Sequence, residues 1–560
     1  MTPHFPQTPN PAKLSTAELL SDRLLNTIGN INPQLLRELK GQLKTRNLSL
    51  ALGLSLLAQG LLYCLFSASL PPTDVPFRPQ HHDYCIDDPS VYGCLFDADG
   101  VVQIDWITWY SHFSYTLGAG LITILILGGV YQLIANYAKE RQTGTLDFLR
   151  LTPQTGDRIF LGKILGVPAM VYLAVLAAIP LHAMMTLLSG YTVLNLTLFY
   201  VSVAEIAVLF FCSAMLIACL GNNQAWLGVL LGSLVLYPAI AVLYVLFAIP
   251  EEFFGELATS SHVLQWWIVP LGQSRFALMS FCWAWTGIGI YWIWQALGRL
   301  FRNPHATLLS KTQSYWLTGE VTLFWLGFVT KTPSMERIDW EPMLYFLSTL
   351  YLTITIILNV MLMPRRQSVQ DWARYHHVNA AEDSIDGATR RSRQSLWIDL
   401  LVGEKSPPTV AIALQLVVVC GVCVAWTIGM REYWTDGTGW RAIGVILAAF
   451  ASMLLFSSLL QHILHWKLKQ RYSIMLGVFF GMFIVPPIVL SILTISVFDA
   501  TNLWTLFVFA GSTFSLPTTT LTALLGTIVW QLAAASLFTA QFKRSIETLG
   551  RSEMRRLVER

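Results

Sequence analysis

Charged and hydroxyl side chains crowd into one short segment, residues 139–149, between two long apolar runs of the chain. The segment reads Lys139-Glu140-Arg141-Gln142-Thr143-Gly144-Thr145-Leu146-Asp147-Phe148-Leu149. The chemistry open to these groups is recognition through ion pairs and hydrogen bonds. A chain this apolar rarely places so many polar groups between two membrane spans without a partner in the water, so we expect a soluble protein to contact the segment.

The same segment predicts a short helix near residues 143–149. Thr143 can cap its first turn, and Asp147 lies near its positive end. Leu146, Phe148 and Leu149 would then offer apolar contacts to a partner. The alternative is a solvated loop that only adds positive charge on one side of a membrane.

A second group of reactive side chains lies in residues 71–112, a stretch rich in aspartate. Its two cysteines, Cys85 and Cys94, are close in sequence, and we expect a disulfide between them on the non-cytoplasmic side. A metal site is the alternative, although the spacing of the nearby side chains matches no known ligand pattern. Those side chains are His81, His82, Asp83, Asp87 and Asp88.

The sequence contains no phosphate-binding loop. The nearest candidate runs from Gly156 to Gly162 and Lys163, but five residues separate the glycines and Ile164 follows the lysine. Such a loop requires G-x-x-x-x-G-K-[ST]. Any ATPase that drives this chain must therefore be a separate polypeptide. We also assign no catalytic residue, bound cofactor or metal to the chain itself.

Composition indicates which elements must position these segments. The chain is 54% hydrophobic and 12% charged, with a mean hydropathy of +0.54, whereas soluble domains carry about 25% charged residues. The net charge of +3 and the lack of basic runs interleaved with aromatics argue against a nucleic-acid partner. The predicted fold is an all-α integral membrane protein surrounded by membrane lipids.

Twelve apolar runs predict about twelve transmembrane helices. They are Leu48–Leu70, Tyr115–Ala135, Leu161–Leu188, Leu196–Leu220, Ala225–Ile249, Ala277–Leu297, Tyr315–Val329, Met343–Met363, Val410–Ile428, Ala442–Leu464, Ile474–Val497 and Leu521–Phe538. Tyr315–Val329 is short and carries Glu320, but omitting it would place the arginines near residues 365 and 390 outside the cell. With it, most of the 36 lysines and arginines fall on the inner side. We expect a plasma-membrane protein with both termini cytoplasmic and no cleavable signal peptide.

An amphipathic helix is predicted just before the first span. Asn32 can cap it, and Pro33 suits its first turn. Its leucines share one face, opposite Arg37 and other basic residues, which suits a helix lying in the headgroup layer. The leucines are Leu35, Leu36, Leu39 and Leu43.

Two motifs together resemble a known family. An N-P-x-x-x-R-E helix followed, after two spans, by E-R-x-x-G-T-L-x-x-L-x-x-T-P resembles the permease subunit of ABC-2 type transporters. The matching residues are Asn32, Pro33, Arg37 and Glu38, then Glu140, Arg141, Gly144, Thr145, Leu146, Leu149, Thr152 and Pro153. The likeness covers roughly the first 300 residues, including a stretch at 251–275 similar to the family's short outer re-entrant helices.

The resemblance implies that the first motif forms an elbow helix and that Thr143–Leu149 forms a coupling helix. A separate cytoplasmic ATPase, which binds ATP and magnesium, would dock on the coupling helix and drive export. The family's cargo would be amphipathic or of a glycan or lipid type. The chain itself would perform no covalent chemistry.

The second half repeats the layout of the first without its motif. Asn303-Pro304 precedes a span, as Asn32-Pro33 does, and Leu396–Leu401 is the best candidate for a second coupling element. We expect a diverged six-plus-six duplication. One chain would then serve as a pseudo-dimer, whereas an unrelated second half would require a homodimer. The expected parts are residues 1–30 (polar), 31–300 (permease half), 301–541 (second half) and 542–560 (basic tail).

Few polar residues inside the spans could serve a substrate path. Glu205 in the fourth run should face protein or water, and Trp266 and Trp267 could line an exit. Two other classes of protein remain as alternatives. A membrane-embedded glycan polymerase, ligase or acyltransferase would need acid and base groups in the 71–112 loop. A secondary transporter would need several intramembrane carboxylates.

Overall fold

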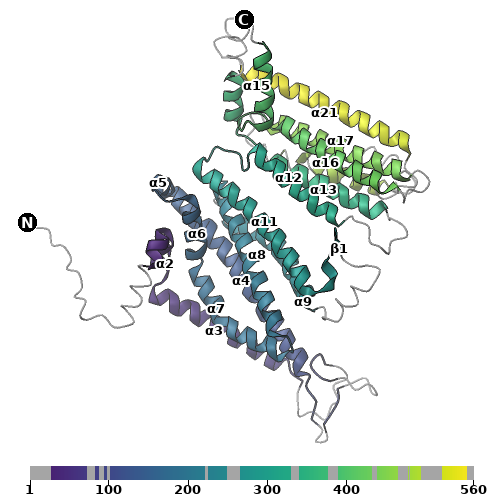
Figure 1. Ribbon diagram of the computed structural model, residues 1–560. Helices are drawn as coiled ribbons and strands as arrows, with labels where there is room; N and C mark the ends of the chain where they lie inside the picture. The colour runs from purple at the N-terminus through teal and green to yellow at the C-terminus, as the bar shows by residue number, and fades with distance from the viewer. Residues whose placement is uncertain are drawn as a thin grey trace, which may run out of the picture. The chain divides into compact units, whose positions relative to one another are not determined.

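The structure, a computed structural model, is built mainly of helices, and about 84% of the residues that it describes are helical (Figure 1). It describes residues 27–71, 82–86, 94–97, 101–220, 225–248, 265–328, 340–375, 389–431, 438–464, 474, 477–478, 480–493 and 520–550.

Nine helices within these described ranges are long and apolar enough to cross a bilayer. They are α3 (Thr45–Ala68), α4 (Trp106–Gln142), α7 (Ala169–Leu188), α8 (Val193–Cys219), α9 (Ala225–Ala248), α11 (Arg275–Arg302), α16 (Thr409–Gly429), α17 (Thr438–Leu464) and α21 (Leu521–Gly550). The protein is therefore a multi-pass, all-α membrane protein.

The chain divides into two compact units. The first comprises Met1–Phe254 and Ser274–Arg302, and the second comprises Gly255–Gln273 and Asn303–Arg560. The core of the first unit is built by α4 with α7, α8 and α9, where side chains such as Ile126 are completely buried.

Three short helices gather at one end of the first unit (Figure 1). They are α2 (Pro33–Gln42), α5 (Thr145–Leu151) and α6 (Gly156–Gly166). Helix α2 packs on α6, and α5 packs against the end of α4. This end of the unit therefore collects the polar segments that the sequence singles out.

The second unit has a core of its own, formed mainly by α13 (Trp340–Met361), α16 and α17. Its further elements are α12 (Lys311–Gly327), α15 (Thr389–Val402), the π-helix η4 (Phe480–Ile484) and α19 (Val485–Ile492). A two-stranded antiparallel hairpin, β1 (Gln265–Trp266) and β2 (Val269–Pro270), leads into the 3-10 helix η2 (Leu271–Gln273).

One prediction from the sequence is wrong in detail. The run Leu161–Leu188 is two helices, α6 and α7, because Pro168 lacks the backbone donor needed to continue α6 and instead precedes α7. Residues 265–273 of the stretch at 251–275 form a hairpin and a 3-10 turn, and the prediction of short outer helices in the rest of this stretch stays untested. Residues 249–264 lie outside the described residues.

Candidate functional site

A tight turn joins the long helix α4 to the short helix α5. Gly144 has φ of 72° and thus takes the left-handed conformation that ends many helices. Thr143 ends α4 rather than capping α5, since its hydroxyl donates to the carbonyl of Lys139 at 3.0 Å. Thr145 Oγ1 donates to the carbonyl of Glu140 at 3.1 Å and ties the start of α5 to α4.

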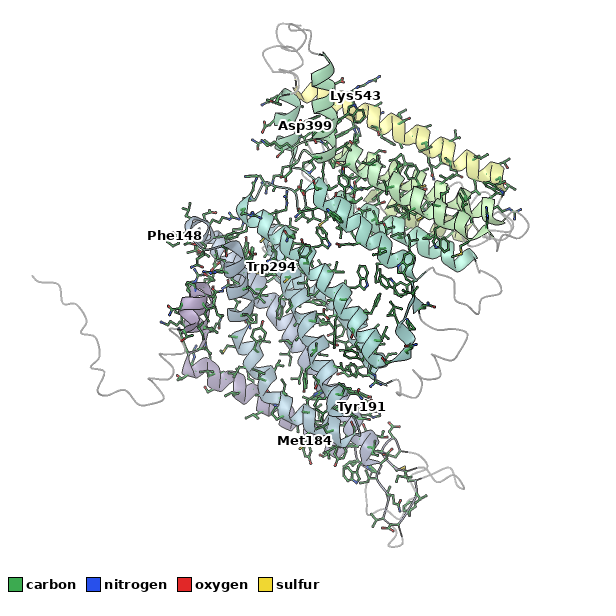
Figure 2. All side chains as sticks on the ribbon, viewed as in Figure 1. Phe148, Met184, Tyr191, Trp294, Asp399 and Lys543 are labelled. Carbon is green, nitrogen blue, oxygen red and sulfur yellow. A yellow bond between two sulfur atoms is a disulfide. The ribbon has the colours of Figure 1, made fainter. Side chains whose placement is uncertain are left out.

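Helix α5 has a buried side and an exposed side. Leu146 and Leu149 are only 4% and 5% exposed and fix the helix to the unit. Phe148 is 70% exposed and Leu151 is 85% exposed, and Phe148 lies at the edge of the unit (Figure 2). The sequence grouped Leu146, Phe148 and Leu149 as contacts for a partner, but only Phe148 of the three is available. The second exposed apolar side chain, Leu151, was missed because the helix extends two residues further than predicted.

The two family-like motifs meet in a charged cluster, defined here as Arg37, Glu38, Glu140 and Lys163. Arg37 Nη2 donates to Glu140 Oε1 and, at 3.0 Å, to Glu38 Oε1. Lys163 Nζ lies 2.5 Å from Glu140 Oε2 and 3.6 Å from Glu38 Oε1. Glu140 is thus held between a cation of α2 and a cation of α6.

The charged cluster is mostly withdrawn from solvent. The side chain of Lys163 is 1% exposed, and those of Glu38 and Glu140 are 10% and 11% exposed. Lys163 Nζ also donates to Asn136 Oδ1 of α4 at 2.8 Å. Burial opposes the charge on Arg37, but the carboxylates of Glu38 and Glu140 outweigh it and raise the pKa of the guanidinium. Arg37 is the more open member, with a side chain that is 45% exposed, and its charge together with that of Lys163 balances the two carboxylates.

Helix α2 packs on α6 through the polar side of α2 and two glycines of α6. Asn32 Oδ1 accepts from the backbone N–H of Leu35 to cap α2, while Asn32 Nδ2 donates to the carbonyl of Arg158 at 2.7 Å. A Cβ added at Gly162 would lie 2.8 Å from the backbone nitrogen of Leu35, and one at Gly166 would lie 2.6 Å from Glu38 Cβ. The four-residue spacing of these glycines is a common device for close helix packing in membranes.

The leucine face of α2 was expected to decide its position, but its deepest side chains are polar. Gln34 is 2% exposed and Glu38 is 8% exposed, whereas Leu43 is 43% exposed. Gln34 Nε2 donates to Glu38 Oε1 at 2.7 Å, so a carboxylate oxygen of the charged cluster also accepts a hydrogen bond from within α2. Hydrogen bonds therefore hold the helix to the protein, while Leu35, Leu36 and Leu39 are half-buried.

Sequence reasoning missed Lys163, which is the most buried member of the charged cluster. It was considered only as part of a failed phosphate loop. The available signal was a lysine inside a Gly162-x-x-x-Gly166 spacing at the start of an apolar run. Arg141, in contrast, is exposed at the end of α4, so the neighbouring Glu140 and Arg141 have different surroundings.

The residues proposed for a substrate path are not brought together within one unit. Glu205 lies half-buried in α8 of the first unit. Trp266 and Trp267 lie in the hairpin of the second unit, where their indole N–H groups donate to the carbonyls of Phe324 and Leu323 of α12 at 3.0 and 3.2 Å. These contacts give both tryptophans a structural role in seating the hairpin on α12.

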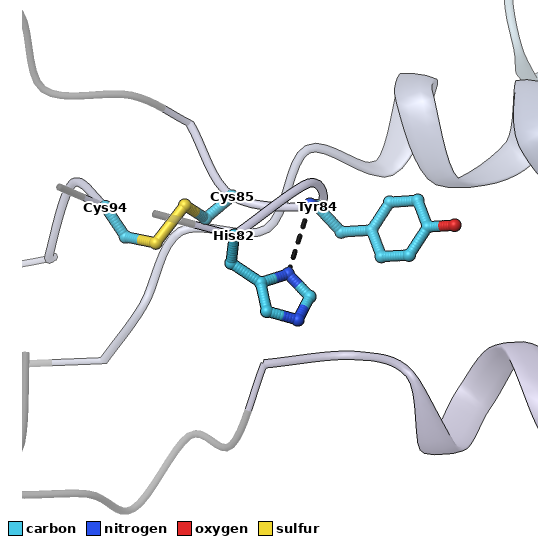
Figure 3. Close-up of a disulfide and its surroundings, with 4 residues drawn as sticks. All are labelled: His82, Tyr84, Cys85 and Cys94. Carbon is cyan, nitrogen blue, oxygen red and sulfur yellow. Dashed lines mark hydrogen bonds between the residues drawn. A yellow bond between two sulfur atoms is a disulfide. The ribbon is translucent and has the colours of Figure 1, made fainter. Parts of the chain in front are cut away.

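Cys85 and Cys94 form a disulfide, with their sulfur atoms 2.02 Å apart (Figure 3). Beside it, the backbone N–H of Tyr84 donates to His82 Nδ1 at 3.2 Å. The histidine ring therefore stabilises the loop next to the disulfide. Of the proposed metal ligands, His81, Asp87 and Asp88 lie outside the described residues, and the described part of the chain holds no group of three candidate ligands.

In the second unit, the predicted stretch Leu396–Leu401 falls in α15, whose Trp397 and Ile398 are 59% and 58% exposed. Lys311, at the start of α12, is 3% exposed and holds the end of α15 in place. Its Nζ donates to the carbonyl of Leu400 at 2.7 Å and to Ser406 Oγ at 2.6 Å. Burial lowers the pKa of Lys311 to about 8.

The two Asn-Pro pairs that the sequence likened to each other differ in structure. Asn303-Pro304 lies in a turn before α12, whereas Pro33 begins a helix.

Comparison of the chain with protein-family models, with curated proteins and with solved structures found no match. The geometry joins the short helix α5, with two exposed apolar side chains, to the long helix α4 through a tight turn, and ion pairs tie that junction to α2 and α6.

Proposed function

We propose that this chain is the membrane-spanning subunit of an ATP-driven exporter of the ABC-2 type, worked by a separate cytoplasmic ATPase. It crosses the plasma membrane twelve times with both termini inside. Its two six-helix halves are diverged duplicates, so that one chain forms the path. The cargo is an amphipathic or glycan-lipid molecule, and the chain performs no covalent chemistry.

One observation carries the proposal: α5 exposes apolar side chains on one side while its other side is packed against the unit. Phe148 and Leu151 are 70% and 85% exposed. Exposed apolar side chains on a rigid element are typical anchors for a partner protein. Leu146 and Leu149, which are buried on the other side of α5, would transmit a movement of α5 to α4.

The charged cluster supports the same role. A force applied to α5 reaches the end of α4, where Glu140 is bound to Arg37 of α2 and Lys163 of α6. Three helices would therefore move together rather than letting α5 bend alone. In this role the cluster transmits motion and does not contact the ATPase.

The proposal is tested by purifying the tagged full chain from its own membrane and measuring magnesium-dependent ATP hydrolysis in the preparation. Hydrolysis should accompany the wild type and should be lost from the Phe148→Ala/Leu151→Ala double variant. Ile107→Ala is a matched control, because Ile107 is 63% exposed but lies at the other end of α4. Absence of hydrolysis from the wild type, or its retention in the double variant, would contradict the proposal.

A further inference from the structure

A cavity of about 640 Å³ lies in the first unit between α3, α4 and α7. This volume is within the range of about 300–1,000 Å³ that is typical of small-molecule sites. Small residues line much of it. They are Ala51, Ser55 and Ala58 of α3, Gly120 of α4, and Ala174 and Ala178 of α7.

We propose that this cavity binds one acyl chain of a membrane phospholipid. The site does not depend on the transport role proposed above. It would be filled from the bilayer in the resting protein.

The chemistry of the lining suits a hydrocarbon chain. None of the described residues that line the cavity is charged. Its polar side chains are occupied within the protein: Ser55 Oγ donates to the carbonyl of Ala174 at 2.7 Å, and Gln59 Nε2 donates to Ser55 Oγ at 3.1 Å. Thr116 Oγ1 donates to the carbonyl of His112 at 2.9 Å. A polar ligand would find few free partners there, whereas an apolar one displaces no hydrogen bond.

The dimensions also fit. Along α3 the lining extends from Ala51 to Leu62, which is roughly 16 Å at 1.5 Å per residue. One leaflet of a bilayer contributes about half of its roughly 30 Å hydrocarbon core. The length of the cavity therefore matches the depth of one leaflet, and its lining on α3 occupies the middle of that helix.

The cavity is open at its side. Leu54 and Ile124 line it and are 65% and 52% exposed. Phospholipid tails are the most abundant apolar molecules at this depth, so a tail can enter laterally while its headgroup stays at the interface.

Gly120 provides a selective test, because a Cβ added there meets nothing within 4 Å although the residue lines the cavity. Gly60 of α3 is the matched control, since a Cβ there also meets nothing within 4 Å, but Gly60 does not line the cavity. The probe is a phosphatidylcholine with a diazirine in the middle of one acyl chain, added to the detergent-purified full chain. After irradiation, labelled peptides are mapped by mass spectrometry.

Labelling of the α3, α4 and α7 peptides should saturate with the probe and be displaced by excess unlabelled dioleoylphosphatidylcholine. Gly120→Phe should reduce the saturable labelling at least fivefold, and Gly60→Phe should leave it within twofold of the wild type. If Gly120→Phe elutes as an aggregate, the experiment uses Gly120→Leu, which places a smaller side chain in the cavity. Labelling that rises linearly without saturation, or equal labelling of the wild type and both Gly120 variants, would overturn the proposal.

Discussion

Lys163 of α6 and Glu140 of α4 form a buried ion pair, with Lys163 Nζ 2.5 Å from Glu140 Oε2. The pair joins two segments that the sequence presents as unrelated, the polar segment after the second apolar run and the start of the third. Because Arg37 of α2 binds the other oxygen of the same carboxylate, Glu140 is the point at which three helices are joined.

Removal of the carboxylate should weaken the protein measurably. Glu140→Gln leaves the buried Lys163 without its nearest anion, and the free energy of unfolding should fall by about 3 kcal/mol, at the low end of the cost of breaking a buried pair because Glu38 and Asn136 remain. The measurement is denaturant unfolding of the purified protein in detergent.

Two further variants separate the pair from a general effect of charge. Glu140→Gln with Lys163→Met should recover part of the loss, since both charges are then removed. Asp147→Asn should change the free energy of unfolding by less than about 1 kcal/mol, because the side chain of Asp147 is 78% exposed in its pair with Arg150. Equal stability of Glu140→Gln and the wild type would show that the ion pair does not hold the helices.

The packing of α2 on α6 should be sensitive to one added methyl group. In Gly162→Ala the new Cβ meets the backbone nitrogen of Leu35 at 2.8 Å, and backbone cannot move aside as a flexible side chain can. We expect a loss of about 1–3 kcal/mol and faster cleavage by trypsin after Lys40 and Lys44. Gly60→Ala, in open space on α3, should match the wild type. Identical cleavage rates for both variants would argue against close packing of α2 on α6.

The two sides of α5 should separate stability from coupling. Leu146→Ala removes a buried side chain and should cost about 2–5 kcal/mol. Phe148→Ala should change the free energy of unfolding by only about 0.5 kcal/mol, as for most exposed sites, yet abolish ATP hydrolysis in the purified preparation. The thermal unfolding and hydrolysis of both variants are compared. A large stability loss in Phe148→Ala would mean that this face is covered within the protein.

Lys311 predicts a pH dependence in the second unit. Its pKa is about 8 in the folded protein, below the usual value of about 10.4, so the unfolded chain binds more protons between these pH values. The free energy of unfolding should therefore rise as the pH rises from about 8 to about 10.4. Lys311→Met should remove this contribution. Thermal unfolding at pH 7.5, 8.5 and 9.5 gives both slopes, and equal slopes would contradict the buried position of the amine.

Helices that depend on composition were predictable from the sequence. The run Leu48–Leu70 corresponds to α3 at Thr45–Ala68, and the run from Ala225 corresponds to α9. Long apolar segments must form helices in a bilayer, because backbone polar groups have no water to bind there. The turn at Gly144 also follows from local chemistry, since glycine reaches positive φ without a steric cost.

Features that depend on distant contacts were not predictable. Arg37 and Glu140 are 103 residues apart, and no local pattern shows that they meet. For the same reason the neighbours Glu140 and Arg141 look equivalent in sequence, although one is buried and the other exposed. Changing both to alanine would mix a loss of stability with any loss of partner binding, so the two must be tested apart. The hairpin at residues 265–270 depends on carbonyl groups of α12 and was equally hidden.

The most direct test of the account places a photoreactive benzoylphenylalanine at Phe148 and irradiates cells that make the full chain. The account predicts an adduct to a polypeptide that is also labelled by 8-azido-ATP, and no such adduct from the same group at Ile107. If Phe148 yields no adduct to a nucleotide-binding polypeptide, while the variant protein is inserted and folded normally, α5 is not the site at which an ATPase drives this protein.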